Sequence, residues 1–532
     1  MMNLGTLLNY PILELNNKKE IIYQDKKNEI KLTLKIKPED TYRKIPIINT
    51  KEELYQFEKI RKLLGQNDNI LKDINKDNIK ILVNDELSEF FASKKFEEGT
   101  YNIRLIFNKP LTDCKFLFYG CIRTIDIDLS FFDTSNTTDM KGMFNWCTDL
   151  KTINLSSLDT KNVTDMSLMF EGCRNINILD LSSFDVSKVN DMTEMFCCCS
   201  NLSGVKFSNF NTKNVKNMKK MFYGCCELKE LDLSSFATSN VTNMNQMFHN
   251  CHKSTEIKFS PAFITEKVED MHKMFFCCNE LINLDLSSFN TSKISDMNEM
   301  FYENLKLKNL NLSSFNTKNV IKMSSMFYNC LNLTCLDLSS FNKENLTDME
   351  QMFYGCHNLN ELNLSNFNNK NVKNMSNCYV FSGLNNIDLS FLNTENVTNM
   401  SYMFSGCENL KYINLSSPFS TKNVTDLSFM FRQCTQLTSI DVSSFDTKNV
   451  KNMDYMFYNC QNLKTINISS FDISNVKGMD GMLALCYNLS SIDITNFIFK
   501  NDNDSNIFWE CKNLKEIFAN ESFPKKMIKR YE

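Results

Sequence analysis

The residues of this sequence that could support chemistry are its cysteines and histidines. The chain of 532 residues contains 21 cysteines but only four histidines, which are His249, His252, His272 and His357. Groups of cysteine and histidine bind zinc, and a cysteine beside a histidine can act as a nucleophile. The best candidate group combines residues that lie about 26 positions apart: Cys225, Cys226, His249, Cys251, His252, Cys277 and Cys278.

The spacing within this group does not favour a metal or a catalytic centre. There is no CxxC…CxxC arrangement, and the sequence contains no HExxH motif, no Gly-rich phosphate loop and no GxSxG elbow. Of the adjacent Cys197, Cys198 and Cys199, one belongs to a structural row, and the other two are interpreted as incidental. We therefore predict that the protein is not an enzyme, binds no metal and needs no cofactor.

Fourteen of the 21 cysteines recur at one position of a repeat. On the apolar side of a packed element, a reduced thiol behaves as a small apolar side chain, and a reduced row fits a cytosolic compartment. Asn304 and Ser382 replace cysteine in two copies. The row consists of Cys121, Cys147, Cys173, Cys199, Cys225, Cys251, Cys278, Cys330, Cys356, Cys407, Cys434, Cys460, Cys486 and Cys511.

The elements that must position these rows are predicted to be one strand and one short helix per repeat. The pair Met-Phe anchors the copies, usually 26 residues apart. Segments such as 333–341 alternate apolar residues, which predicts a short strand with one buried face. Met166, Met169, Phe170 and Cys173 follow the spacing i, i+3, i+4, i+7, which predicts one face of a short helix.

Neither element can bury its apolar face alone, so successive repeats must stack on one another. The predicted fold class is an α/β solenoid of the leucine-rich-repeat kind, with about 16 turns over residues 101–515. A second interpretation makes the segment NVTDM, residues 162–166, another short strand, with helix only from Met166 onward. It changes the cross-section of the solenoid but not its existence.

The strand contributes a second row, which lies between two buried positions and should face solvent. In this row aspartate alternates with asparagine or lysine, so carboxylates of neighbouring turns do not meet. The alternation avoids a repulsion of roughly 1 kcal/mol in water for each such contact. The row is the candidate binding face, and a merely solvated sheet face is the simpler interpretation. Its members are Asp128, Asn154, Asp180, Lys206, Asp232, Lys258, Asp285, Asn311, Asp337, Asn363, Asp388, Asn414, Asp441, Asn467 and Asp493.

A third row places asparagine at a repeated bend, for example at Asn162 and Asn423. An asparagine at such a bend can hydrogen-bond backbone groups of its own turn and of the next one. A fourth row of phenylalanines follows the strand and is predicted to belong to the core.

The two ends of the chain lack the repeat. Residues 1–100 are predicted to form an α+β cap, with strands at 29–37, 78–83 and 100–107 and a helix at 52–64; an independent recognition domain is the alternative. Residues 516–532 are predicted to form a C-terminal cap and tail, in which the basic stretch 525–530 is solvated.

The composition and the first 20 residues limit which partners and which cellular location we expect for the protein. The net charge of −4, from 59 basic and 63 acidic residues, gives no reason to expect nucleic acid as a partner. Residues 1–20 lack the basic leader and unbroken apolar core of a secretory signal, and no segment reaches the ~20 apolar residues of a transmembrane helix. We expect a cytoplasmic protein, with the cell surface or secretion as the alternative.

The repeats are similar to those of one known family. The segments FDTSNTTDMKGMF, from Phe132, and LNTENVTNMSYMFSGCENL, from Leu392, resemble the repeat of the BspA-like leucine-rich-repeat surface proteins. The resemblance covers about residues 112–515 and implies surface adhesins that mediate contact between proteins or cells. It implies no catalytic residues.

Together these features predict a non-catalytic scaffold that binds a protein partner over an extended repeat surface. An adhesin that reaches the cell surface by a route not evident in the sequence is the first alternative. An enzyme whose site lies in the N-terminal cap is the second. The sequence names neither the partner nor the oligomeric state.

Overall fold

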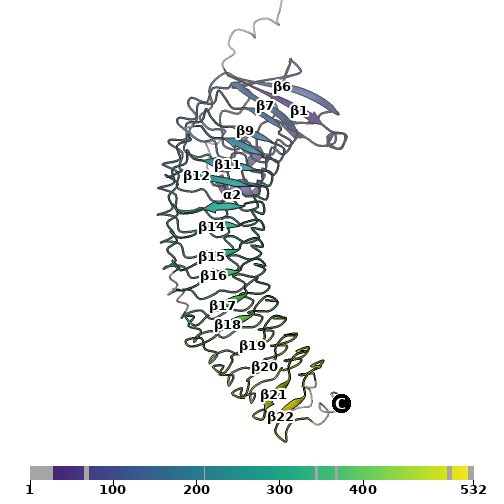
Figure 1. Cartoon of the computed structure of the whole chain (residues 1–532). Helices are drawn as coiled ribbons and strands as arrows, with labels where there is room; N and C mark the ends of the chain where they lie inside the picture. Colours follow the sequence, from purple (N-terminus) through teal and green to yellow (C-terminus); the bar gives the residue numbers. More distant parts are fainter. Residues whose placement is uncertain are drawn as a thin grey trace, which may run out of the picture.

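Stacking of the repeats shapes the whole chain. A computed structural model describes residues 28–64, 71–208, 210–341, 345–365, 370–499 and 506–524. Sixteen strands, β7 to β22, follow one another along the chain and stack along a curved axis (Figure 1). Each neighbouring pair that shares a sheet in this part is parallel. The solenoid predicted from the repeats is therefore confirmed.

The helices and strands have the following bounds. The strands are β1 (Glu29–Ile36), β2 (Ile45–Pro46), β3 (Ile79–Val83), β4 (Glu86–Ser88), β5 (Ser93–Lys94), β6 (Gly99–Phe107), β7 (Thr124–Phe131), β8 (Thr152–Asn154), β9 (Ile178–Asp180), β10 (Gly204–Lys206), β11 (Glu230–Leu233), β12 (Glu256–Phe259), β13 (Asn283–Asp285), β14 (Asn309–Asn311), β15 (Cys335–Asp337), β16 (Glu361–Asn363), β17 (Asn386–Asp388), β18 (Tyr412–Asn414), β19 (Ser439–Ile440), β20 (Thr465–Ile466), β21 (Ser491–Ile494) and β22 (Glu516–Ala519). The helices are α1 (Lys51–Leu54) and α2 (Glu58–Leu64), with a single 3-10 turn at Pro38–Asp40.

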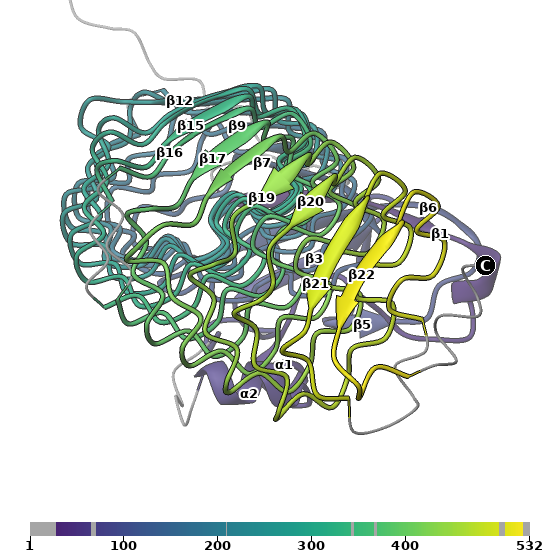
Figure 2. The same ribbon diagram turned by 60° about the horizontal axis from the view of Figure 1, so that its bottom comes forward.

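The N-terminal segment closes the first turn of the solenoid with a sheet. Strands in the order β4-β3-β6-β1-β7-β8 form one six-stranded sheet, in which β1 pairs antiparallel with both β6 and β7. The helices α1 and α2 lie on the side of the solenoid away from its strands (Figure 2). The solenoid strands β7 and β8 belong to this sheet, so the sheet does not separate the N-terminal segment from the solenoid. The predicted domain boundaries at residues 100 and 515 stay a prediction. Residues 1–20 and 525–530 lie outside the described residues.

A buried ion pair fastens this segment to the first two turns. Asp40, only 1% exposed, accepts a hydrogen bond of 3.0 Å from Arg123, whose other nitrogen donates to Asp149 at 2.7 Å. Burial alone would raise the pKa of Asp40, but hydrogen bonds from Arg123 and Arg43 lower it to about 2. The guanidinium of Arg123 thus links the 3-10 turn to two consecutive turns of the solenoid.

The helix predicted for every turn is wrong. In the segment after Asn162, Leu168 and Gly172 have φ angles of 62° and 74°, which are left-handed and interrupt a helix. The N–H of Leu168 donates to Thr193 of the next turn at 2.8 Å, and that of Phe170 donates to Met195 at 2.9 Å. A helix would direct these groups to its own carbonyls four residues back. Within the described residues, α1 and α2 are the only α-helices.

The second interpretation of this segment is closer to the structure. Asp165 forms parallel bridges with Asp139 of the previous turn and Asp191 of the next. The buried face was nevertheless predicted correctly, because Met166 and Phe170 are fully buried. The spacing i, i+3, i+4, i+7 therefore identified the inward side chains, although tight turns bonded to their neighbours, and not a helix, produce it.

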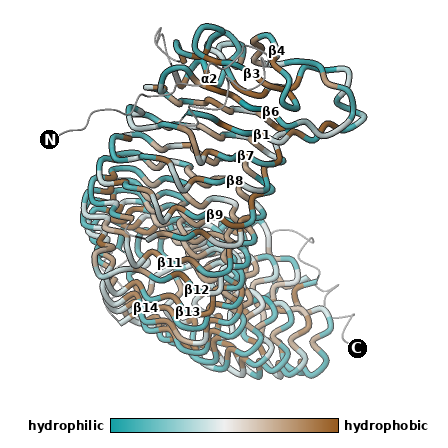
Figure 3. Tube along the Cα trace, turned by 90° about the horizontal axis from the view of Figure 1, so that it is seen from above, coloured by the Kyte–Doolittle hydropathy of each residue, from teal (hydrophilic) through white to brown (hydrophobic). Residues whose placement is uncertain are grey.

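The core is built from rows of identical side chains. Fourteen stacked rings run without a break from Phe118 to Phe457, with centroids 5.1 to 5.9 Å apart. A buried row of threonines joins successive turns; Thr160, for example, donates to the carbonyl of Asp185 at 3.0 Å and accepts from its N–H at 2.8 Å. Both apolar and polar residues occur along every turn (Figure 3).

The cysteine row is buried and is also a row of hydrogen-bond donors. The thiol of Cys330 donates to the carbonyl of Phe301 in the preceding turn at 3.2 Å, and other members do the same. Asn304 replaces a cysteine and donates to Phe275 in the same way at 2.8 Å. All 21 cysteines are free thiols. Most side chains in this row therefore give a buried carbonyl a second hydrogen bond, beside the backbone N–H of its own turn, as Phe301 accepts from Asn304 at 3.4 Å.

The asparagines of the bend row bind backbone carbonyls of the preceding turn. Asn162 donates to Ser135 at 3.1 Å, and Asn423 donates to Glu395 at 2.7 Å. The sequence predicted backbone hydrogen bonds for this row, but it placed them toward the next turn.

The arrangement of thiols predicts how the native chain reacts with a thiol reagent. Only Cys335 is exposed and only Cys198 and Cys226 are half-buried, so three thiols should react quickly. The remaining cysteines should react at the rate of unfolding, because the reagent cannot enter a packed core. The measurement is a timed titration of thiols, with Cys335→Ala as the control that removes one fast site. Rapid reaction of most thiols in the folded chain would contradict this structure.

The junction at Arg123 predicts an acid-sensitive variant. Asp40→Asn should lower the free energy of unfolding by about 3 kcal/mol, because it takes from the buried guanidinium of Arg123 one of its two carboxylates and leaves only Asp149. In the wild type, the contribution of ionised Asp40 to the free energy of unfolding is fully present above the ordinary aspartate pKa of 3.8. It is lost as the pH falls toward the lowered pKa of about 2. Urea unfolding at several pH values measures this. Glu39→Gln, at an exposed neighbouring carboxylate, is the control, and equal stability of the two variants would refute the prediction.

Candidate functional site

The candidate binding face is the outer surface of the stacked strands, here called the strand face. In most of these strands a buried or half-buried side chain lies between two exposed ones. The predicted Asp/Asn/Lys row occupies the second exposed position. Most of its members are exposed, and only Asp128 and Asn414 are partly covered. The prediction that this row faces solvent agrees with the structure, while its role in binding stays a prediction.

Neighbours in this row touch one another. Asn363 donates its amide to Asp337 at 3.0 Å, Asn154 donates to Asp128 at 3.3 Å, and Lys206 forms an ion pair with Asp180 at 3.2 Å. The alternation therefore places a donor beside each of these carboxylates, where a second carboxylate would repel it.

The strands pair in twos, and the pairing follows the alternation. In six of the eight pairs the aspartate lies on the first strand and its asparagine or lysine on the second, in register, as in Asp285 with Asn311 and Asp388 with Asn414. Asp441 lies just past β19, and Asp493 on β21 is paired with Phe518. The pairs are β7-β8, β9-β10, β11-β12, β13-β14, β15-β16, β17-β18, β19-β20 and β21-β22. The structural unit is therefore two turns.

The same side chains also end their strands. Asp337 accepts a hydrogen bond from the backbone N–H of Ser339 at 2.9 Å, and Asn311 accepts one from Ser313 at 3.1 Å. Hydrogen bonds from Ser339 and Asn363 outweigh burial and lower the pKa of Asp337. In Asp337 this engages one carboxylate oxygen and leaves the other for a partner, whereas the single amide oxygen of Asn311 is already used in the turn.

Shallow hollows open on the strand face where one pair of strands meets the next. A hollow of about 340 Å³ lies over β13, β14 and β15, between Asn311 and Asp337. Another of about 380 Å³ lies over β18 and β19, beside Tyr412, whose side chain is 59% exposed. These hollows alternate with flat paired strands, and their walls are mainly backbone, serine and asparagine.

An aromatic row, defined as Tyr223, His249, Phe276, Tyr302, Tyr328 and Tyr354, lies among the tight turns. Its rings stack in sequence with centroids 4.4 to 4.6 Å apart and with angles of 3° to 22° between their planes. Stacking uses the ring faces, so the row offers edges and hydroxyl groups and not the open faces that bind sugars. The sequence analysis missed this row, although an aromatic residue three places after a left-handed residue in six successive repeats signals it.

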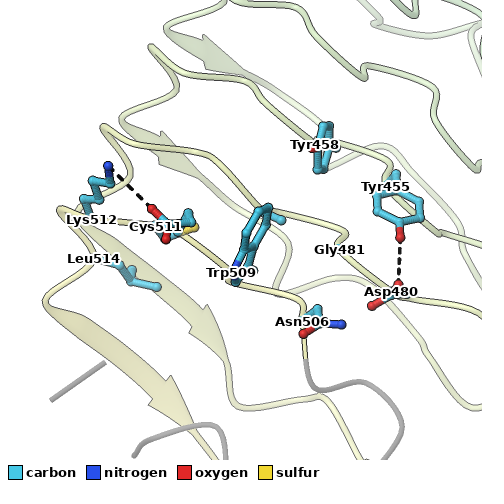
Figure 4. Close-up of a pocket in the computed structure, with 11 residues that line it drawn as sticks. Tyr455, Tyr458, Asp480, Gly481, Asn506, Trp509, Cys511, Lys512 and Leu514 are labelled. Atoms are coloured by element: carbon cyan, nitrogen blue, oxygen red, sulfur yellow. Dashed lines mark hydrogen bonds and ion pairs between the residues drawn. The ribbon is translucent and has the colours of Figure 1, made fainter. Parts of the chain in front are cut away.

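A separate hollow of about 800 Å³ lies at the C-terminal end of the solenoid. Its wall includes Trp509, and the hydroxyl of Tyr455 donates to Asp480 at 2.8 Å (Figure 4). Lys512 forms an ion pair with Glu510 at 3.5 Å. These residues form a polar hollow at the end of the solenoid.

The structure does not bring the cysteine and histidine candidates together as ligands. The ring of His249 is enclosed in the aromatic row, and desolvation lowers its pKa to about 4. Cys251 donates to Phe222, and His252 pairs with Asn279 at 2.9 Å. In the part of the chain that the structure describes, the one group with metal-ligand geometry lies elsewhere, at Glu171, Glu194 and Cys197. Among these same residues, no helix is long and apolar enough to span a membrane.

The alternation on the strand face predicts a salt-dependent defect. The double variant Asn154→Asp, Asn311→Asp places carboxylates beside Asp128 and Asp285, at roughly 1 kcal/mol of repulsion for each contact in water. The variant should unfold more readily at low salt and recover part of the loss at high salt. The neutral double variant Asn154→Ser, Asn311→Ser should show no such recovery. Thermal unfolding at two salt concentrations measures the stability of both double variants. An equal salt dependence of the two would contradict the predicted contacts within the row.

The repeats match one family along most of the chain. The family described as "Mycoplasma protein of unknown function, DUF285" matches residues 112–206, 175–260, 255–361, 331–416 and 411–521. Adjacent matches overlap, as expected for a continuous array. No protein with a curated description matches the chain.

Solved structures with related repeats superpose only loosely. A leucine-rich repeat protein from Eubacterium ventriosum ATCC 27560 is 12% identical, with a TM-score of 0.28, over 65% of this chain and 85% of that one. The mouse RP105/MD-1 complex gives 13% identity and a TM-score of 0.22, over 77% of this chain and 68% of that one. The matched repeats cover more than half of the chain, and the protein therefore belongs to the DUF285 family.

Proposed function

We propose that the protein is a non-catalytic scaffold that binds a protein partner along its strand face. The observation that supports this is the continuous exposure of one polar row across the strands from β8 to β21, interrupted by hollows at the pair boundaries. A solenoid of this kind presents a long, pre-formed surface without a deep apolar pocket, which suits a protein and not a small ligand.

Binding on such a face rests on many modest contacts and a few anchors. Interface energy concentrates in aromatic and other large side chains surrounded by polar ones. The strand face carries exposed apolar anchors at Ile178 and Tyr412, each within polar surroundings. A partner that spans two or more hollows would place its own side chains beside these anchors and hydrogen-bond the second carboxylate oxygen of the aspartates in the row.

The proposed location follows from two arguments that point in different directions. The free thiols favour a reducing interior such as the cytoplasm. The resemblance to BspA-like surface proteins favours adhesion at the cell surface, and this is the alternative proposal. Cell fractionation with an antibody against the chain distinguishes them.

The binding proposal is tested with charge reversal on the strand face. Asp285→Lys together with Asp337→Lys should weaken capture of a partner about tenfold or more, because both residues face the same hollow. Glu395→Lys reverses one exposed carboxylate away from the strands and should leave binding intact. The measurement is cross-linking of the full chain to its bound proteins, followed by titration of the identified partner. Cross-links that avoid the strand face would overturn the proposal.

A further inference from the structure

A group of ligand-bearing side chains gathers where two neighbouring turns meet. One carboxylate oxygen each of Glu171 and Glu194 and the sulfur of Cys197 lie within 4.8 Å of one another. The sulfur of Cys198 lies 3.6 Å from that of Cys197. Glu171 belongs to one turn and the other three residues to the next, so the group spans a turn boundary.

This group breaks the pattern of the aromatic row. Glu171 and Cys197 occupy the same position of the repeat as Tyr223 and His249, the first rings of that row. At this place, two turns carry a carboxylate and a thiol where later turns carry rings. A lone thiol can donate to a stacked carboxylate, as Cys277 does to Glu303 at 3.3 Å, but here two carboxylates and a thiol come together at one place.

The surroundings give the sulfur of Cys198 room to move. Cys198 has a φ angle of 60°, and the same position is glycine in the turns before and after it, at Gly172 and Gly224. Neither glycine places a side chain against this sulfur, and a Cβ added at Gly224 would only be in ordinary contact with it, at 3.8 Å. Neighbouring turns therefore do not fix the thiol in place.

The polar atoms around the group are incompletely paired. Glu171 is only 6% exposed and accepts a hydrogen bond of 2.7 Å from the amide nitrogen of Asn145. The amide oxygen of Asn145 is buried and has no partner. Lys59 approaches Glu171 at 3.4 Å and Lys220 approaches Glu194 at 3.9 Å, but the Lys59 side chain is 63% exposed and free to swing away.

Distances and ligand types favour one metal class. With zinc–sulfur bonds of about 2.3 Å, tetrahedral geometry separates two thiolates by about 3.8 Å, close to the distance found here. Thiolates select zinc-like ions over calcium and magnesium, which prefer oxygen ligands. The sulfur of Cys198 lies outside the 4.8 Å group and would rotate toward it to complete, with Cys197 and the two carboxylates, a four-coordinate site.

We propose that Glu171, Glu194, Cys197 and Cys198 bind one divalent cation of the zinc class. Four protein ligands leave no open coordination position, so the ion is structural and does not activate water. It would tie the turn of Glu171 to the next one, near the place where α2 reaches the solenoid through Lys59. The site lies apart from the strand face, and its failure would leave the proposed binding function untouched.

The test uses the full chain, reduced and freed of metal with a chelator, and titrated with Zn²⁺ by calorimetry. We expect one equivalent to bind, and Co²⁺ in its place to give the absorption of thiolate-to-cobalt charge transfer. Glu194→Gln should weaken binding about tenfold or more, and Cys197→Ser with Cys198→Ser should abolish the charge-transfer band. Cys226→Ser and Cys335→Ser are the controls, because they remove accessible thiols outside the group.

Thermal unfolding distinguishes a variant that no longer binds Zn²⁺ from a variant that no longer folds. Wild type should gain stability with Zn²⁺, and Glu194→Gln, which changes a partly exposed residue, should fold normally and lose most of that gain. Bound Zn²⁺ should also protect Cys198 from a thiol reagent while Cys226 stays reactive. Absence of stoichiometric binding, or binding unchanged in both variants, would overturn the proposal.

Discussion

Hydrogen bonding between successive turns is the constraint on which this structure depends. The tight turns contain left-handed residues, such as Leu168, that prevent them from closing hydrogen bonds as a helix does. Their N–H groups instead reach the carbonyls of the following turn, as Phe170 reaches Met195. Every turn is therefore incomplete without its neighbours, which holds consecutive repeats in register.

Once register is held, each repeat position must tolerate its own copy a few ångströms away. Phenylalanine rings stack, threonine both donates and accepts, and a cysteine thiol or the Asn304 amide donates to the carbonyl before it. Aspartates follow one another at Asp139, Asp165 and Asp191, but on the strand face aspartate alternates with neutral or basic residues, as Asp337 does with Asn311 and Asn363. The pairing of strands in twos is the backbone counterpart of that alternation.

At some repeat positions the side chain does not pack against a similar one in the next turn. These positions serve a purpose other than stacking of the turns. Glu171 and Cys197 directly precede the aromatic row at the same repeat position, and the exposed Tyr412 interrupts a mainly polar position. Asp40 and Arg123 do not recur in the repeats, and they join the N-terminal segment to an array of nearly identical turns. Repetition therefore stabilises the molecule, and singular residues give it ends and distinct surfaces.

The sequence by itself determined the repeat, the inward side chains, the buried cysteine row and the exposed Asp/Asn/Lys row, because these follow from periodicity and charge alone. It did not determine the backbone of the Met-Phe segment, since a helix and a run of tight turns bury Met166 and Phe170 alike. The choice between them depends on hydrogen bonds to Asp191 and Met195, 25 residues further along the chain. Only the tertiary structure could decide this, and only it brings Glu171 beside Cys197, because that contact exists across a turn boundary and in no local pattern.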